Sequence, residues 1–246
     1  MPQTENLYLF LLILPLISFL YSSVGHGGAS GYLALMALFS FAPEQMKPTA
    51  LLLNIFVAGI SFYYYYKEGY FNKKLFFSFS ITSIPLAFIG GTIEVEASLY
   101  KKILAFLLIF AILKMLNVFG KDSESVKKVK LWKGLILGGG IGFFSGLIGI
   151  GGGIILTPVI LVLHWGKMKE AAAVSALFIW VNSASGLIGQ LSSGKLLEKS
   201  AFLLVGIALT GGVLGGYFGS KKINNQNLRY ILSFVLIIAS VKLYFT

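Results

Sequence analysis

Two glycine-rich segments hold the residue types best suited to binding a small anion through the backbone. They are Gly25-His26-Gly27-Gly28-Ala29-Ser30-Gly31 and, beginning 124 residues later, Gly149-Ile150-Gly151-Gly152-Gly153. Because glycine has no side chain, successive backbone N–H groups can turn toward one point, and a helix that follows adds the positive end of its dipole. We therefore expect an anion to bind between the two segments, at the starts of short helices beginning near Tyr32 and Ile154.

Close helix packing is the alternative use of glycine, because small residues let helix backbones approach each other within a membrane. We favour packing for glycine pairs inside longer apolar segments, such as Gly90-Gly91 and Gly215-Gly216. We favour binding for the two central segments, because each interrupts an apolar run between two short pieces. The residues that we assign to the site from these segments are Gly25, His26, Gly27, Gly28, Ser30, Gly149, Gly151, Gly152 and Gly153.

Amide and hydroxyl side chains form a second set of candidates. Asn54 and Ser61 share one face of a helix, and Ser175, Asn182 and Ser185 form the corresponding set in the other half. Buried amides in lipid must find partners, so these groups either bind substrate oxygens or bond to a neighbouring helix. Gln190 and Thr157 are weaker candidates of the same kind. Both uses stay open.

His26 is the titratable side chain that the sequence places deepest in an apolar region. It either carries a proton coupled to anion movement or donates a hydrogen bond to a nearby carbonyl as a neutral histidine. The chain has two histidines and no cysteine, so we expect neither a metal site nor a cofactor. No embedded set of acid, base and nucleophile points to an enzyme.

The elements that position these residues are long apolar blocks. Hydrophobic residues make up 57% of the chain and charged residues 12%, whereas soluble domains carry about 25% charged residues. The blocks span 7–24, 32–42, 49–66, 75–93, 99–119, 134–148, 154–165, 171–191, 201–220 and 228–245. Three blocks in each half approach the ~20 residues that cross hydrocarbon, and those beside the glycine segments are shorter. The pattern predicts an all-α polytopic membrane protein.

The two halves are copies of each other. Gly25, Gly27 and Gly28 align with Gly149, Gly151 and Gly152, and the alignment continues with a slowly growing offset into the last apolar block of each half. We therefore predict two transmembrane repeats, residues 1–119 and 134–246, joined by a linker at 120–133. Each repeat has three full transmembrane helices and a pair of half-helices, either broken or re-entrant, at its glycine segment.

The basic residues predict how the repeats are oriented. An odd number of crossings in each half gathers 14 Lys and Arg residues on one side: Lys67, Lys73, Lys74, Lys114, Lys121, Lys127, Lys128, Lys130, Lys133, Lys167, Lys169, Lys221, Lys222 and Arg229. The other side holds six: Lys47, Lys101, Lys102, Lys195, Lys199 and Lys242. The richer side is then cytoplasmic, both termini are extracytoplasmic, and the repeats have inverted topology in the cytoplasmic membrane. The spread of charge over loops favours contact with lipid over nucleic acid, and nothing in the sequence favours one oligomeric state.

The duplicated pattern of Gly-x-Gly-Gly-Gly followed by Thr157-Pro158 resembles the sulfite exporter TauE/SafE family, also called TSUP transporters. The resemblance covers residues 7–245, although the first repeat has Leu33-Ala34 where the second has Thr157-Pro158. It implies a secondary transporter that moves small sulfur-containing anions, of the sulfite, thiosulfate or organosulfonate class, by alternating access. An anion channel of the same architecture is the alternative.

Overall fold

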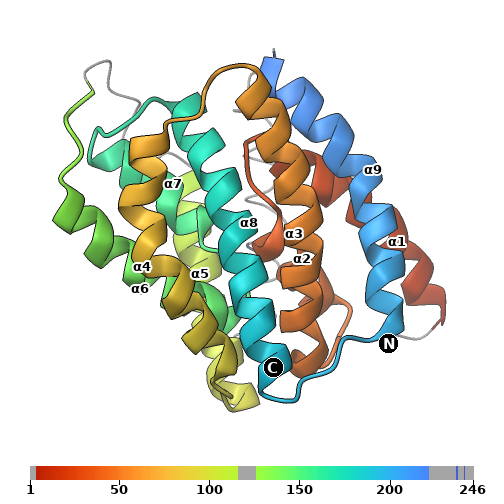
Figure 1. The fold of residues 1–246 in the computed structure, drawn as a ribbon. Helices are drawn as coiled ribbons and strands as arrows, with labels where there is room; N and C mark the ends of the chain where they lie inside the picture. Colours follow the sequence, from red (N-terminus) through yellow and green to blue (C-terminus); the bar gives the residue numbers. More distant parts are fainter. Residues whose placement is uncertain (1–3, 116–125, 222–236, 238–240, 242–246) are drawn as a thin grey trace.

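The computed structural model describes residues 4–115, 126–221, 237 and 241, and this part of the chain is helical without strands (Figure 1). The helices of the first half are α1 (Thr4–Ser22), α2 (Ala29–Leu38), α3 (Pro43–Lys67), α4 (Lys73–Thr92) and α5 (Ala97–Met115). Those of the second half are α6 (Leu131–Ile148), α7 (Gly153–Val162), α8 (Met168–Ser192) and α9 (Lys199–Lys221). The expected block 228–245 lies outside the described residues except at 237 and 241.

Local sequence explains where several helices begin. Pro43 stands at the start of α3, where a missing N–H costs nothing. The Asn72 side chain caps α4 by accepting a hydrogen bond from the Leu75 N–H at 3.1 Å. The short helices α2 and α7 begin directly after Gly28 and Gly152, both in the left-handed region with φ of 106° and 78°. Thus α2 starts at Ala29, not near Tyr32 as expected, because Gly28 supplies the turn.

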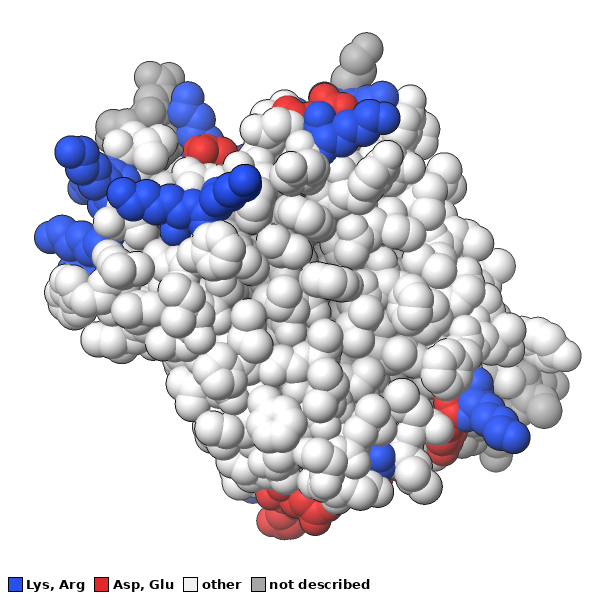
Figure 2. All heavy atoms as spheres, in the orientation of Figure 1, with Lys and Arg blue, Asp and Glu red and all other residues white. Residues whose placement is uncertain are grey.

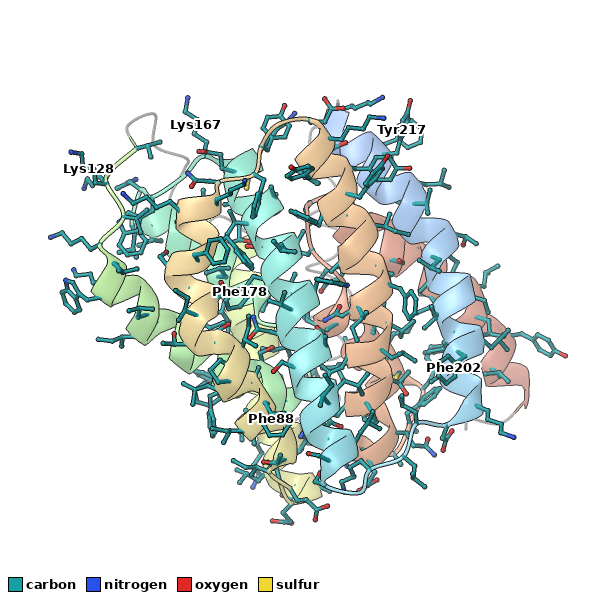
Figure 3. All side chains as sticks on the ribbon, in the orientation of Figure 1. Phe88, Lys128, Lys167, Phe178, Phe202 and Tyr217 are labelled. Atoms are coloured by element: carbon teal, nitrogen blue, oxygen red, sulfur yellow. The ribbon has the colours of Figure 1, made fainter. Side chains whose placement is uncertain are left out.

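The outer surface has the character of a protein embedded in lipid, so the expected polytopic membrane fold is confirmed. Five helices, α3, α4, α6, α8 and α9, are long and apolar enough to span a bilayer. On the face in Figure 2, charged side chains gather at the two ends of the molecule, and uncharged atoms cover the belt between them. Figure 3 shows Lys128 and Lys167 at one end and Phe202, which is 58% exposed, on the side of the belt.

Glycines bring helices from opposite halves of the chain together. α6 packs on α4, and α9 packs on α1. A Cβ at Gly138 or Gly142 would collide with backbone of α4, and one at Gly211 or Gly215 would collide with backbone of α1. These glycines therefore serve close packing, which for Gly211 and Gly215 is the use favoured from the sequence.

The centre of the molecule lies between α3 and α8, which contact each other. α3 runs toward the end that holds Lys67, whereas α8 starts at that same end and runs away from it (Figure 1). The glycine segments and α2 lie inside this arrangement, and every residue from 21 to 37 is buried.

Candidate functional site

The two glycine segments meet at the middle of α3 and α8. Gly27 lies against Asn54, Ala58 and Ile179, such that a Cβ at Gly27 would stand 2.6 Å from Asn54 Oδ1. Gly151 lies against Asn54, Ile179 and Ser183, and its Cβ would collide with Asn54 Nδ2. The Asn54 side chain thus contacts both segments, which are 124 residues apart in the sequence.

At their other ends the segments make crosswise contacts. Gly25 of the first half packs on Ala172, near the start of α8, and Gly149 of the second half packs on Lys47, near the start of α3. Each glycine segment therefore begins beside the first turns of the long helix of the other half, α8 or α3. Each then continues to Asn54, where the two segments meet. Gly25, Gly149 and Gly151 all have positive φ values (76°, 87° and 70°), a conformation that glycine adopts without strain.

The N-termini of α2 and α7 supply backbone donors at this place. The first amides of any helix have no partner within the helix, and they carry the positive end of its dipole. Gly28 and Gly152 occupy the N-cap positions and have no side chain with which to cap these amides. The arrangement can hold an anion without a charged side chain, because α3 from 48 to 66 and α8 from 171 to 192 contain no charged residue.

Two buried polar atoms at the centre lack a hydrogen-bond partner among the described residues. Asn54 is fully buried; its Nδ2 donates to Ser183 Oγ at 3.2 Å, and its Oδ1 has no partner. Ser145 Oγ is also buried without a partner, and Ser145 Cβ lies 3.5 Å from where a Cβ on Gly152 would be. An unpaired buried polar group costs about 1–3 kcal/mol. Such groups point to a site for a ligand or an ordered water.

His26 joins the two halves through a short chain of hydrogen bonds. Its Nδ1 lies 2.9 Å from Val24 O, which fixes Nδ1 as the donor. In the neutral ring Nε2 then accepts from Thr157 Oγ1 at 3.3 Å, and Thr157 Oγ1 lies 2.7 Å from Ser175 Oγ. The bond from Nδ1 to a nearby carbonyl is one of the two uses left open for His26, and Thr157 and Ser175 lie in the same chain of hydrogen bonds.

Other expected site residues bond to neighbouring helices. Asn182 donates to Phe178 O at 2.8 Å on its own helix and accepts from Ser83 Oγ of α4 at 2.7 Å. Ser185 donates to Ile84 O of α4. Ser61 donates to Ser22 O, at the end of α1. These three polar side chains stabilise helix contacts around the site.

Ser30 lies in the first turn of α2, and its hydroxyl donates to Tyr21 Oη at 2.8 Å. Sequence reasoning did not include Ser145, Ser183 or Ile179, which the structure brings to the glycine segments. Ser145 precedes Gly149 by one helical turn, a spacing that could have indicated it. The positions of Ser183 and Ile179 depend on how α8 is rotated against α3.

Comparison with known proteins agrees with the fold. A family model described as Sulfite exporter TauE/SafE matches residues 10–243. The chain is 36% identical to the probable membrane transporter protein y4hK of Sinorhizobium fredii over 92% of this chain and 94% of that protein. It is 28% identical to a probable membrane transporter protein of Methanocaldococcus jannaschii, over 92% and 94% of the two chains.

The probable membrane transporter protein YfcA of Escherichia coli is 26% identical over 92% of this chain and 84% of its own length. No solved structure matches the chain. Since the family model spans nearly the whole sequence and the relatives match over most of their length, this chain belongs to the sulfite exporter TauE/SafE family of membrane transporters.

Proposed function

We propose that this protein is a secondary transporter for small sulfur-containing anions of the sulfite, thiosulfate or organosulfonate class. The observation that carries the proposal is the meeting of both glycine segments at Asn54, with the Ser145 hydroxyl near Gly152, a buried donor that has no hydrogen-bond partner among the described residues. A small oxyanion accepts several hydrogen bonds from one point, which suits amides that converge from two helix N-termini. The TauE/SafE membership of the chain supports the same class of substrate.

The anion is held by dipoles alone. The amides after Gly151 and Gly152 provide donors at α7, those after Gly27 and Gly28 provide donors at α2, and the Asn54 amide lies between them. The second segment has the fuller set of glycines and therefore the less obstructed donors. Binding of this kind is weak enough to release the anion on the other side, as transport requires.

Movement of the halves gives access to the site. Gly27 and Gly151 pack directly on Asn54 and Ile179, so an anion enters only when the segments separate. The crosswise contacts of Gly25 with Ala172 and of Gly149 with Lys47 support two inverted repeats, residues 1–119 and 134–246, that rock about the α3–α8 contact. The tight packing favours alternating access over an open channel.

Orientation follows from the charge distribution. The end that holds Lys67, Lys128 and Lys167 faces the cytoplasm, in the cytoplasmic membrane, and the other end faces outward. Both chain termini are then extracytoplasmic.

Flux measurements in proteoliposomes test the function. Purified protein is reconstituted and assayed for uptake of sulfite, thiosulfate, sulfate, sulfoacetate, taurine and acetate. We expect saturable uptake of one or more sulfur anions that is accelerated by the same anion inside the vesicles. Ohmic current without such acceleration would identify a channel, and flux of none of these anions would overturn the proposal. Asn54→Ala should lower the rate about tenfold, because it removes the second N–H of Nδ2, the first of which donates to Ser183.

A further inference from the structure

A cavity of about 230 Å³ opens at the end of the molecule away from Lys128 and Lys167. Segments from both halves line it: the start of α3, the α4–α5 connection, the end of α6, and the end of α8 with the loop that follows. Its polar lining includes Lys47, Glu94, Tyr100, Gln190, Ser193 and Lys195. None of these residues belongs to the site at the glycine segments.

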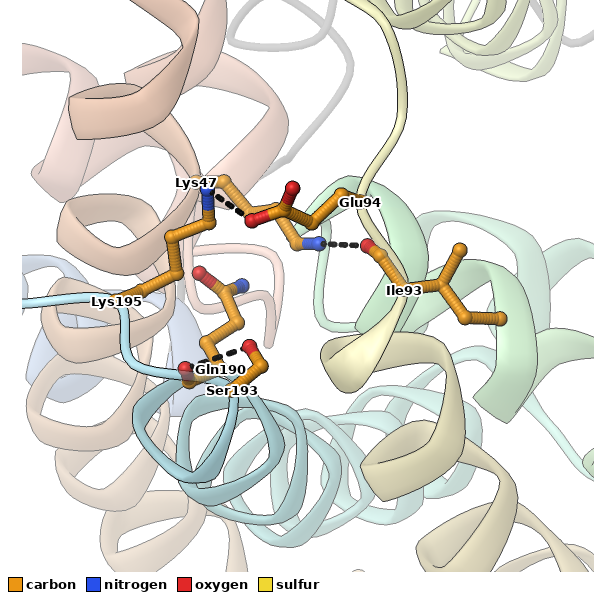
Figure 4. A network of polar contacts seen from close by, with 6 residues as sticks. All are labelled: Lys47, Ile93, Glu94, Gln190, Ser193 and Lys195. Carbon is orange, nitrogen blue, oxygen red and sulfur yellow. Dashed lines mark hydrogen bonds and ion pairs between the residues drawn. The ribbon is translucent and has the colours of Figure 1, made fainter.

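Cationic and amide donors face this cavity. Lys195 Nζ lies 2.6 Å from Glu94 Oε1, and Lys47 Nζ donates to Ile93 O at 3.4 Å (Figure 4). Gln190 lines the same cavity as both lysines; the residue is only 1% exposed, and its Nε2 has no hydrogen-bond partner among the described residues. A buried N–H donor in the lining of a cavity that also holds two lysines is suited to an oxyanion.

Three carboxylates also line the cavity. Glu44 and Glu96 are exposed at its rim, and Glu94 lies in the loop between α4 and α5. The hydrogen bond and the charge of Lys195 hold the pKa of Glu94 below its usual range, so this carboxylate is ionised. Glu94 is thus an anion of the chain itself, paired with Lys195, one of the donors that a free oxyanion would use.

The cavity leads to the second glycine segment. Lys47 packs on Gly149, the first residue of that segment, and Tyr100 donates from its hydroxyl to Ile148 O at 3.1 Å. Asn54 lies on the same helix as Lys47, two turns or about 10 Å further along. An anion in the cavity would therefore be next to the outer end of the transport site.

We propose that this cavity is an anion-binding vestibule, in which a small oxyanion displaces Glu94 and binds Lys47, Lys195 and Gln190 Nε2. The inference rests on the proposed transport function, for which it supplies an entry or exit site. Glu94 acts as a tethered competitor: it occupies Lys195 when no anion is present and moves aside with its loop when one arrives.

The two partners of the ion pair should have opposite effects. Glu94→Gln removes the competitor, so the Kd for sulfate and the KM for thiosulfate should fall about two- to fivefold. Lys195→Gln and Lys47→Gln should raise both constants by a similar factor. Gln190→Leu, which keeps the size but removes the buried donor, should raise them about tenfold. Lys199→Gln is the matched control, because Lys199 lies at the same end but does not line the cavity.

A purely structural ion pair predicts a different pattern. Loss of either partner would then change stability and KM in the same direction, and the exchanged pair Glu94→Lys with Lys195→Glu would restore the wild-type values. Either result would overturn the vestibule. We expect instead that the exchanged pair binds sulfate more weakly than wild type, because a carboxylate then replaces the ammonium group at position 195 and the new lysine lies on the α4–α5 loop that moves aside.

Calorimetry with sulfate separates this proposal from the transport function. If proteoliposomes show no anion flux, transport fails, but sulfate binding that strengthens in Glu94→Gln and weakens in Lys195→Gln would still support the vestibule. If wild type transports thiosulfate while these variants leave Kd and KM unchanged, the vestibule fails and the transport function stands.

Discussion

Replacing Gly151 by alanine is the sharpest test of the central site. Gly151 has a φ of 70°, which costs an alanine roughly 1–2 kcal/mol. The new methyl group would also stand 2.9 Å from Ile179 Cγ2 and 3.0 Å from Ser183 Oγ, in addition to colliding with Asn54. Overpacking of this kind costs about 1–3 kcal/mol. The two terms together make about 2–5 kcal/mol.

This destabilisation of about 2–5 kcal/mol falls on the contact at Asn54, where both glycine segments meet. A loss of 2 kcal/mol changes a population about 30-fold. We therefore expect the initial rate of anion uptake into proteoliposomes to fall at least about tenfold in Gly151→Ala, because the methyl group displaces Asn54 and the amides cannot turn toward the same point. Size-exclusion chromatography and thermal unfolding in detergent would establish that the variant is folded.

Three further glycine variants separate the effect of backbone strain from the effect of overpacking. Gly27→Ala adds crowding against Asn54 at a position without positive φ. Gly194→Ala adds the backbone strain, with a φ of 85°, where nothing lies within 4 Å. Gly140→Ala, in α6, adds neither. We expect Gly27→Ala to impair uptake and the other two to leave it unchanged. Wild-type uptake by folded Gly151→Ala and Gly27→Ala would refute the assignment of the site.

Three further results are expected. If His26 couples a proton to transport, His26→Gln should abolish the pH dependence of uptake between about pH 5.5 and 7.5, the range around the pKa of an unperturbed histidine. An unchanged pH profile would show that His26 has a structural role alone. Asn182→Ala should lower the free energy of unfolding by about 1–3 kcal/mol, since it leaves Ser83 without its partner, yet leave KM unchanged, and the opposite pattern would place Asn182 with Asn54 in the site. Because the chain has no cysteine, an introduced cysteine is the only thiol that an impermeant reagent can label. Gly69→Cys should react only from the cytoplasm and Gly194→Cys only from outside. Labelling of both from one side would contradict the proposed orientation.

Several properties of this protein followed from sequence alone. The length and order of the apolar blocks determined the helices, because a chain in lipid must satisfy its backbone hydrogen bonds within each segment. The repeat of Gly25, Gly27 and Gly28 at Gly149, Gly151 and Gly152 indicated where helices break, because glycine permits a positive φ whatever surrounds it. These are local properties, and spacing along the chain is enough to detect them.

The roles of individual polar residues required the tertiary structure. Asn54 and Asn182 look alike in sequence, each an amide within a long apolar helix. Asn54 faces both glycine segments, whereas Asn182 faces α4 and bonds to Ser83. Periodicity tells which residues share a face of one helix but not which neighbour that face meets. The rotation of α3 against α8 depends on how closely the packed glycines allow the surrounding helices to approach.

The proposed vestibule could not be predicted from the sequence, because its residues come together only through tertiary contacts. Lys47, Glu94, Gln190 and Lys195 come from distant segments and follow no common spacing. In sequence the two lysines and Glu94 are ordinary residues near helix ends, and Gln190 is only a weaker candidate among the buried polar side chains. Only the crosswise packing of the two halves brings the start of α3, the α4–α5 loop and the end of α8 to one cavity. The sequence thus determined the helices and their breaks, and the tertiary contacts decided which side chains face an anion.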